Sequence, residues 1–332
     1  MQAILMREPG EPDVLMQSEL PTPEIQHPTQ LLVRLAAAGV NPIDTKIRRR
    51  GPLLPETTAT VLGCDGAGVV EAVGSEVTRF QPGDLVWFCH GGLGGLVGNY
   101  AEYIVIDASV AQPKPRSLDF VQAAAAPLVL LTAWESLHDR AQVRAGQTVL
   151  IHGGAGGVGH VAIQLAHLAG ARVATTVSSP EKADYVHALG AECAINYREE
   201  DLVEAIADWT EGRGVDVALD TVGPDVFRQT IPAMAVYGDL VSILDPGPFD
   251  LQEARTRNLR ISLELMLTPQ LRGLTDAQAH QGEILRRCGD LFDQNQLRIH
   301  VDQSYPLERA ADAHRRLEAG GMQGKLVLTT RN

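Results

Sequence analysis

The sequence predicts a two-domain α/β protein, in which a β-rich domain is combined with a doubly wound parallel sheet. Three observations predict this class. Strand-like and helical segments alternate from about residue 148 to residue 265. A glycine-rich turn joins the first strand of that series to its helix, and the residues before about 120 form short strand-like runs. A chain of 332 residues is long enough for two domains that each bury a core.

The β-rich region comes first along the chain. Its strand-like runs, separated by glycine turns, lie at residues 30–36, 69–74, 83–88 and 101–107. Short strands of this kind suit a small, irregular, barrel-like domain. The composition changes near residues 117–120, where Ser117 or Asp119 would make a good helix cap.

The alternating region follows a helical run at residues 132–137. Its predicted strands are residues 148–151, 171–177, 192–197, 215–220, 239–244 and 260–265. The predicted helices between them are residues 158–168, 181–189, 200–209 and 226–234. Two more helices, 276–293 and 307–317, precede an apolar strand at residues 325–328, which we expect to return to the first domain.

The glycine-rich turn carries the clearest functional signal. It reads Gly154-x-Gly156-x-x-Gly159 and lies between a predicted strand and a predicted helix. Glycines permit positive φ and let backbone N–H groups approach a diphosphate at a helix N-terminus. The motif alone is a weak signal, but this position is the context that dinucleotide binding requires. The alternative is a purely structural strand–helix turn.

The end of the next predicted strand indicates which nicotinamide cofactor is used. An NAD site usually has Asp or Glu here to bind the ribose 2′-OH, but this strand ends in Ser178-Ser179 with Lys182 close behind. Two hydroxyls and a cation suit a 2′-phosphate, so the prediction is NADP(H). The alternative is that Ser179 only caps the next helix and Lys182 is solvated.

Composition and charge exclude several other classes. The net charge of −13 argues against binding to nucleic acid or to an anionic membrane. The four cysteines form no C-x-x-C pair, no apolar run is long enough to span a bilayer, and the first residues show no cleavage signal, so a cytoplasmic location is expected. Hydrolase motifs are absent. His152 ends a strand, where we expect it to pack or to hydrogen-bond locally.

Nine short pieces occur in an order that is specific although no single piece is decisive. They are Asn41-Pro42-Ile43-Asp44, Gly63-x-Asp65-x-x-Gly68-x-Val70, Gly83-Asp84, Ala123-Ala124-Ala125 with Pro127-Leu128, Thr132-Ala133, Gly153 to Gly159, Ile195-Asn196-Tyr197-Arg198, Asp220-Thr221-Val222-Gly223 and Gly324-Lys325. Through them nearly the whole chain resembles the zinc-independent, zeta-crystallin-like quinone oxidoreductases of the medium-chain dehydrogenase/reductase superfamily.

The resemblance implies a domain arrangement. A GroES-like catalytic domain would comprise residues 1–122 and, after the chain returns, residues 269–332. A Rossmann domain that binds NADP(H) would comprise residues 123–268. The resemblance also implies a homodimer in which the strand near Ile261–Leu265 extends the sheet across a two-fold axis. An unpaired β-prone edge allows such pairing, and the alternative is an ordinary covered edge strand.

The resemblance also bears on metal binding. Zinc-dependent relatives carry a cysteine where Asn41 stands, His-Glu where Cys64-Asp65 stand, and a four-cysteine lobe. Here Cys64 and Asp65 offer at most two ligands of unlike type, and a catalytic zinc needs three. We therefore expect no metal.

By resemblance, Asn41 and, more weakly, Asp44 are the expected catalytic residues, although Asn41 could serve only as a turn cap and Asp44 only as a helix N-cap. Thr132 and Tyr197 could likewise be structural. Some family members have an aromatic residue where Lys46 stands, which leaves substrate preference open. The expected cofactor contacts are Asn41, Thr132, Gly154, Ala155, Gly156, Gly157, Val158, Gly159, Ser178, Ser179, Lys182, Tyr197, Val222, Ile243, Leu244 and Lys325.

The expected function is metal-free hydride transfer from NADPH to a quinone or an α,β-unsaturated carbonyl. The acceptor's oxygen would be stabilised by hydrogen bonds, and the protein would supply position and a dry site. The alternatives are an enoyl-thioester reductase, a zinc-free alcohol dehydrogenase, and a crystallin-like protein that binds NADPH without turnover.

Overall fold

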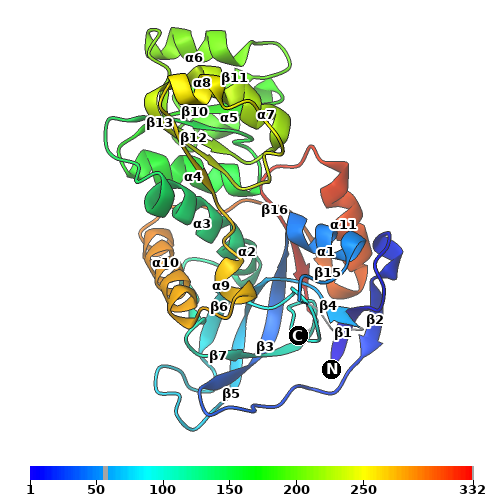
Figure 1. Cartoon of the computed structure of the whole chain (residues 1–332). Coiled ribbons are helices and arrows are strands. Elements are labelled where there is room, and N and C mark those ends of the chain that lie inside the picture. The colour runs from blue at the N-terminus through cyan, green and yellow to red at the C-terminus, as the bar shows by residue number, and fades with distance from the viewer. Residues whose placement is uncertain (55–58, 331–332) are drawn as a thin grey trace. The chain divides into compact units, whose positions relative to one another are not determined.

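The computed structural model describes residues 1–54 and 59–330 (Figure 1). The chain divides into two compact units. The first unit comprises Met1–Leu128 together with Leu267–Asn332, and the second comprises Val129–Met266. Over the described ranges, no helix combines the length and the apolar character needed to cross a bilayer.

The first unit is β-rich, and both parts of the chain build its main sheet. That sheet has the strand order β15-β16-β3-β5-β6-β8, with β7 also paired to β3, while β2-β1-β4 form a smaller sheet. The strands are β1 (Gln2–Met6), β2 (Met16–Glu19), β3 (Gln30–Val40), β4 (Thr60–Val61), β5 (Asp65–Val73), β6 (Leu85–Cys89), β7 (Tyr103–Asp107), β8 (Gln112–Pro113), β15 (Val301–Pro306) and β16 (Lys325–Thr329).

The C-terminal part of the chain lies in this unit as well. Strand β16 pairs antiparallel with β3 (Figure 1). In this pairing Leu326 lies opposite Val40. Alternate residues of β3, including Leu31 and Val33, are buried in one apolar core with Phe88. The helices of the unit are η1 (Pro12–Val14), α1 (Pro42–Arg50), α2 (Phe120–Ala125), α9 (Thr268–Leu271), α10 (Thr275–Asp293), η4 (Leu307–Arg309) and α11 (Ala310–Ala319), and α3 (Pro127–Trp134) runs across the boundary between the units.

The second unit is a parallel sheet of order β11-β10-β9-β12-β13-β14. Its strands are β9 (Thr148–Ile151), β10 (Arg172–Val177), β11 (Cys193–Asn196), β12 (Val215–Asp220), β13 (Met234–Ser242) and β14 (Arg260–Leu263). Its helices are η2 (Glu135–Arg140), α4 (Gly157–Leu168), α5 (Pro180–His187), α6 (Leu202–Thr210), α7 (Pro224–Thr230), η3 (Ile231–Ala233) and α8 (Gln252–Thr256). The strand order reverses between β9 and β12, which is where doubly wound sheets bind their ligands.

Several predicted boundaries in this unit were wrong, including the start of the strand predicted over 239–244, which begins at Met234. The helix predicted over 226–234 ends at Thr230, and a short 3-10 turn containing Pro232 follows, because proline lacks the N–H that an α-helix needs. The strand predicted over 260–265 ends at Leu263. Glu264 turns out of the strand, and its buried carboxylate accepts a 2.7 Å hydrogen bond from Arg140 Nε.

Candidate active site

The predicted cofactor residues of the second unit follow the carboxyl ends of neighbouring parallel strands. The glycine-rich turn follows β9, and the other predicted residues are Ser178, Ser179 and Lys182 after β10, Tyr197 after β11, Val222 after β12, and Ile243 and Leu244 after β13. Because these strands are adjacent and parallel, one edge of the sheet gathers all of these residues. Thr132 does not follow a strand; it is a buried residue of α3.

The turn after β9 requires glycine at two positions. A Cβ atom on Gly154 would lie 2.1 Å from Thr175 Oγ1, and one on Gly159 would lie 2.2 Å from the Gly153 carbonyl oxygen. Real Cβ atoms do not approach other atoms so closely. Gly153 itself has φ of +65°, in the left-handed region that favours glycine. The glycines therefore allow the turn to pack closely against β10 and against the start of α4.

Backbone amides are left unpaired at the start of α4. The first amides of any α-helix have no intrahelical acceptor. Over residues 1–54 and 59–330, the amides of Ala155, Gly157 and Val158 donate no hydrogen bond to another part of the chain. Such amides, together with the positive end of the helix dipole, favour an anion such as a diphosphate.

The residues after β10 combine a cap with a cation. Ser179 is the N-cap of α5, because its Oγ accepts a hydrogen bond from the Lys182 amide at 3.4 Å. Pro180 takes the first helical position, so the predicted capping role is confirmed. Lys182 is half-buried in the first turn of the helix, and Tyr197 at the end of β11 is 57% exposed. Neither position excludes a contact with a phosphate.

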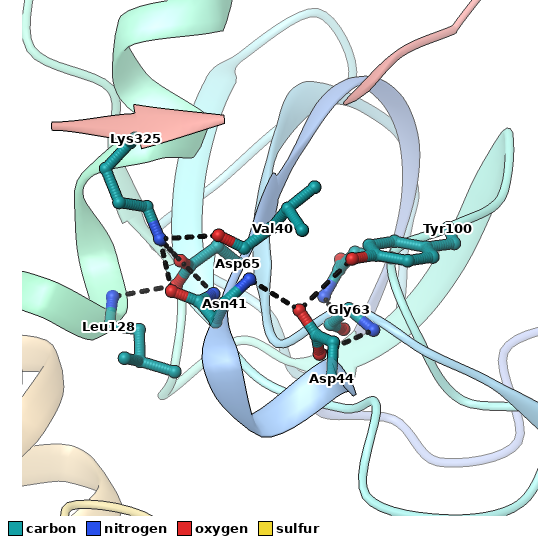
Figure 2. Close-up of polar contacts among 9 residues, drawn as sticks. Val40, Asn41, Asp44, Gly63, Asp65, Tyr100, Leu128 and Lys325 are labelled. Atoms are coloured by element: carbon teal, nitrogen blue, oxygen red, sulfur yellow. Dashed lines mark hydrogen bonds and ion pairs between the residues drawn. The ribbon is translucent and has the colours of Figure 1, made fainter. Parts of the chain in front are cut away.

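In the first unit, Asn41 and Asp44 lie together at the start of α1. Asn41 is the N-cap, and Asp44 Oδ2 accepts a hydrogen bond from the Asn41 backbone amide at 2.8 Å (Figure 2). The alternative that Asp44 is the N-cap is therefore wrong, because Asp44 stands three positions into the helix. Asp44 Oδ1 also accepts from the Gly63 amide at 3.3 Å, which ties α1 to the segment before β5.

Lys325 lies at the centre of a buried polar cluster with Asn41 and Asp65 (Figure 2). Its Nζ donates to Asn41 Oδ1 and, at 3.0 Å, to the Val40 carbonyl oxygen, and lies 3.8 Å from Asp65 Oδ2. Asn41 Nδ2 donates to Asp65 Oδ2 at 2.8 Å. The side-chain amide of Asn41 is thus held from both ends, and Leu128 N donates to the other oxygen of Asp65 at 2.7 Å.

Burial shifts the acidity of these groups. It raises the pKa of Asp44 to about 7, although the hydrogen bond from the Asn41 amide opposes the shift. Burial also raises the pKa of Asp65 and lowers that of Lys325, while their attraction acts in the opposite direction on both groups. A carboxyl with a pKa near 7 is able to exchange protons at neutral pH.

Sequence reasoning missed two members of this cluster. Tyr100 Oη donates to Asp44 Oδ2 at 3.1 Å (Figure 2). It also lies 3.1 Å from Nε2 of His314 on α11. Both side chains are buried. No local pattern marks either residue, since Tyr100 follows a loop and His314 lies within an ordinary helix. In the second unit, the pattern also gave no sign that Asp220 Oδ1 accepts from the amides of Val222 and Gly223.

Comparison with known proteins identifies the family. The model of the alcohol dehydrogenase GroES-like domain matches residues 27–116, and that of zinc-binding dehydrogenases matches residues 189–328. The quinone oxidoreductase of Pseudomonas aeruginosa is 35% identical, with 96% of each chain covered. The chain belongs to the quinone oxidoreductase family. It is therefore an oxidoreductase, and the predicted family, fold class and enzyme class are confirmed.

Solved structures agree with this assignment to the quinone oxidoreductase family. An alcohol dehydrogenase superfamily protein from Novosphingobium aromaticivorans has a TM-score of 0.92 at 36% identity, with all of both chains covered. The Escherichia coli quinone oxidoreductase complexed with NADPH has a TM-score of 0.88 at 31% identity, covering 99% of this chain and 100% of that chain.

The side chains of this protein that could act as metal ligands do not fit a catalytic zinc ion. The ammonium group of Lys325 donates a hydrogen bond to Asn41 Oδ1 and lies beside the Asp65 carboxylate. A positive charge of the chain itself therefore occupies the place beside these oxygen atoms that a metal ion would need. Burial holds the pKa of Cys64 well above its usual value, whereas zinc binds the thiolate. In the part of the chain that the structure describes, no three His, Cys, Asp or Glu side chains gather in a possible metal site.

Proposed function

We propose that this protein transfers hydride from NADPH to a quinone or an α,β-unsaturated carbonyl without a metal ion. The observation that carries the proposal is the turn at residues 153–159, whose unpaired amides lie at the switch point of the parallel sheet. Hydride is the chemistry that NADPH supplies when it is bound. The E. coli quinone oxidoreductase that resembles this chain was solved with NADPH.

The residues after β10 and β11 support a preference for the 2′-phosphate. Ser178, Ser179 and Lys182 would offer two hydroxyls and an ammonium group, and Tyr197 would lie against the adenosine ribose-phosphate. No Asp or Glu ends β10 in the position where NAD enzymes bind the ribose 2′-OH. The amides of Ala155, Gly157 and Val158 would hold the diphosphate.

Asn41 is the side chain that we propose to orient the acceptor. Its amide is held by Lys325 at Oδ1 and by Asp65 at Nδ2, so it cannot rotate without breaking both bonds. Asn41 Nδ2 has a second N–H, which could donate to the oxygen of an acceptor as negative charge develops there. A fixed donor of this kind stabilises the charge without metal assistance. Asp44, with a pKa near 7, is the proposed proton source near Asn41.

The proposal is tested by the oxidation of NADPH with a panel of acceptors in the presence of a chelator. We expect turnover with quinones or simple enones, measured as the loss of the nicotinamide absorbance. Turnover with enoyl thioesters alone, or with alcohols and NADP⁺ alone, would replace the proposal with the corresponding alternative. NADPH protection against thermal unfolding without oxidation by any acceptor would instead indicate a crystallin-like protein.

We also propose a homodimer formed through β14. This strand is the edge of the sheet, and the side chain of Leu263 is 59% exposed on it. Exposed β edges are templates for pairing, and two-fold pairing would continue the sheet into a second copy. Sedimentation equilibrium should give twice the mass of the chain, and a monomer at micromolar concentration would contradict this proposal.

The four free cysteines support a reducing, cytoplasmic location.

A further inference from the structure

His152 directly precedes the glycine-rich turn and joins the end of β9 to β10 and α7. It follows β9 and is 1% exposed. Its Nε2 lies 2.8 Å from Oγ1 of Thr230 on α7, and its Nδ1 lies 3.4 Å from Oγ1 of Thr176 on β10. Thr176 Oγ1 in turn accepts a hydrogen bond from the Gly153 amide at 2.9 Å. The chain of contacts therefore ends on the first peptide of the turn.

Counting protons fixes the direction of every bond in this chain. The hydroxyl of Thr230 donates to the Val226 carbonyl oxygen at 2.7 Å, so Thr230 Oγ1 must accept from His152 Nε2–H. Nδ1 of a neutral imidazole then carries a lone pair and accepts from the Thr176 hydroxyl. The Thr176 oxygen remains free to accept from Gly153. Of the two neutral tautomers, only the one with its proton on Nε2 satisfies all four bonds.

Two further bonds hold this peptide and the one that follows it. Thr221 Oγ1 donates to the His152 carbonyl oxygen at 2.7 Å, and the Gly154 amide donates to the Thr176 carbonyl oxygen at 3.1 Å. The peptide between His152 and Gly153 is thus fixed from β10 and from the loop after β12. Gly153 begins the turn with φ of +65°. The orientation of the peptide between His152 and Gly153 therefore determines where the following amides lie.

We propose that His152 is a positioning residue for the nicotinamide cofactor, acting through Thr176 on the Gly153 amide to hold the glycine-rich turn in its binding geometry. This inference rests on the proposed binding of NADPH by that turn. It assigns His152 no contact with the cofactor or the acceptor. Burial supports the neutral form, because it lowers the pKa of His152 to about 4 even though Asp220 lies nearby and opposes the shift.

The test removes one hydroxyl while keeping the shape of the side chain. Thr176→Val deletes the bridge between His152 and Gly153, and the loss of a hydrogen bond to a buried partner should weaken NADPH binding roughly 10-fold. The KM for NADPH should rise accordingly, with kcat at saturating NADPH nearly unchanged. Thr176→Ser keeps the hydroxyl and should restore the affinity to within about 3-fold of the unmodified protein.

Thr210→Val is the matched control. Thr210 is a buried threonine of the same unit whose hydroxyl also donates to a carbonyl oxygen, that of Ile206, and accepts from a glycine amide, that of Gly214. It lies at the end of α6, whereas the turn follows β9. Thr210→Val should lower thermal stability to a similar degree and leave the NADPH affinity unchanged. Equal affinity losses in the two valine variants would reduce His152 and Thr176 to a general role in folding.

A spectroscopic measurement tests the tautomer without a substitution. The nitrogen-15 chemical shifts of the His152 imidazole at pH 7 should show a protonated Nε2 and an unprotonated Nδ1. A proton on Nδ1 would overturn the inference. If the unmodified protein binds NADPH and Thr176→Val binds it equally well, only the role of His152 fails. If the unmodified protein binds no NADPH, the proposed function fails first.

Discussion

Gly159→Ala is expected to abolish most NADPH binding. The new Cβ atom would lie 2.2 Å from the Gly153 carbonyl oxygen and 2.8 Å from the Gly154 Cα, which are both backbone atoms of the turn. The turn must move away from α4 to relieve this contact. Displacements of about 1 Å in a positioned site commonly cost on the order of 100-fold, and we expect at least that loss in NADPH affinity.

A second glycine of the turn, Gly156, provides a milder substitution for comparison with Gly159→Ala. A Cβ atom on Gly156 would lie 3.1 Å from the same Gly153 oxygen, a contact that needs a shift of only a few tenths of an ångström. Gly156→Ala should therefore bind NADPH more tightly than Gly159→Ala. Fluorescence titration of both variants measures the order, with circular dichroism as the check that each remains folded. Full affinity in a folded Gly159→Ala variant would show that the turn does not hold the cofactor.

Lys182→Glu is expected to change cofactor preference. A hydrogen bond between charged groups contributes about 1.5–3 kcal/mol, so the loss of the ammonium should cost roughly 10- to 100-fold in NADPH affinity, and the new carboxylate would repel the 2′-phosphate in addition. NADH has no such phosphate, and its KM should change by less than about 3-fold. Steady-state kinetics with both cofactors and one acceptor measures this difference.

Arg213→Glu is the control for net charge. Arg213 is an exposed residue of the same unit that precedes β12, so it lies at the edge of the sheet opposite to the glycine-rich turn. It carries the same charge reversal as Lys182→Glu and should leave both KM values unchanged. If Lys182→Glu raises the two KM values equally, Lys182 does not contact the 2′-phosphate, and the preference must come from Ser178, Ser179 or Tyr197.

The parallel sheet was predictable because its signals are local. The predicted strands and helices of the second unit each have their own periodicity, whereas the short helix α8 was not predicted. The turn at 153–159 shows both the glycine spacing and its place between strand and helix. The short strands β1, β2, β4, β8 and β15 were not predicted. They have between two and six residues, and their pairing depends on partners far along the chain.

The polar clusters depend on contacts that no local pattern reveals. Lys325 meets Asn41 across 284 positions, and Tyr100 meets His314 across 214. The resemblance to the family suggested Asn41 and Lys325, but only the folded structure shows the hydrogen bond between them. His152 was expected to pack or to hydrogen-bond locally, and one of its partners, Thr230, is 78 positions away. Residues of this kind can be recognised as functional candidates only when the tertiary structure shows which distant residues they contact.

The central claim is that the amides at the start of α4 bind the diphosphate of NADPH and that no metal ion is required. Calorimetric titration of the protein after dialysis against a chelator tests it most directly. We predict one NADPH bound per chain, with NADH bound more weakly and with oxidation of NADPH by a quinone preserved in the same sample. The absence of heat with either nucleotide, or activity that returns only when zinc is added, would contradict the account.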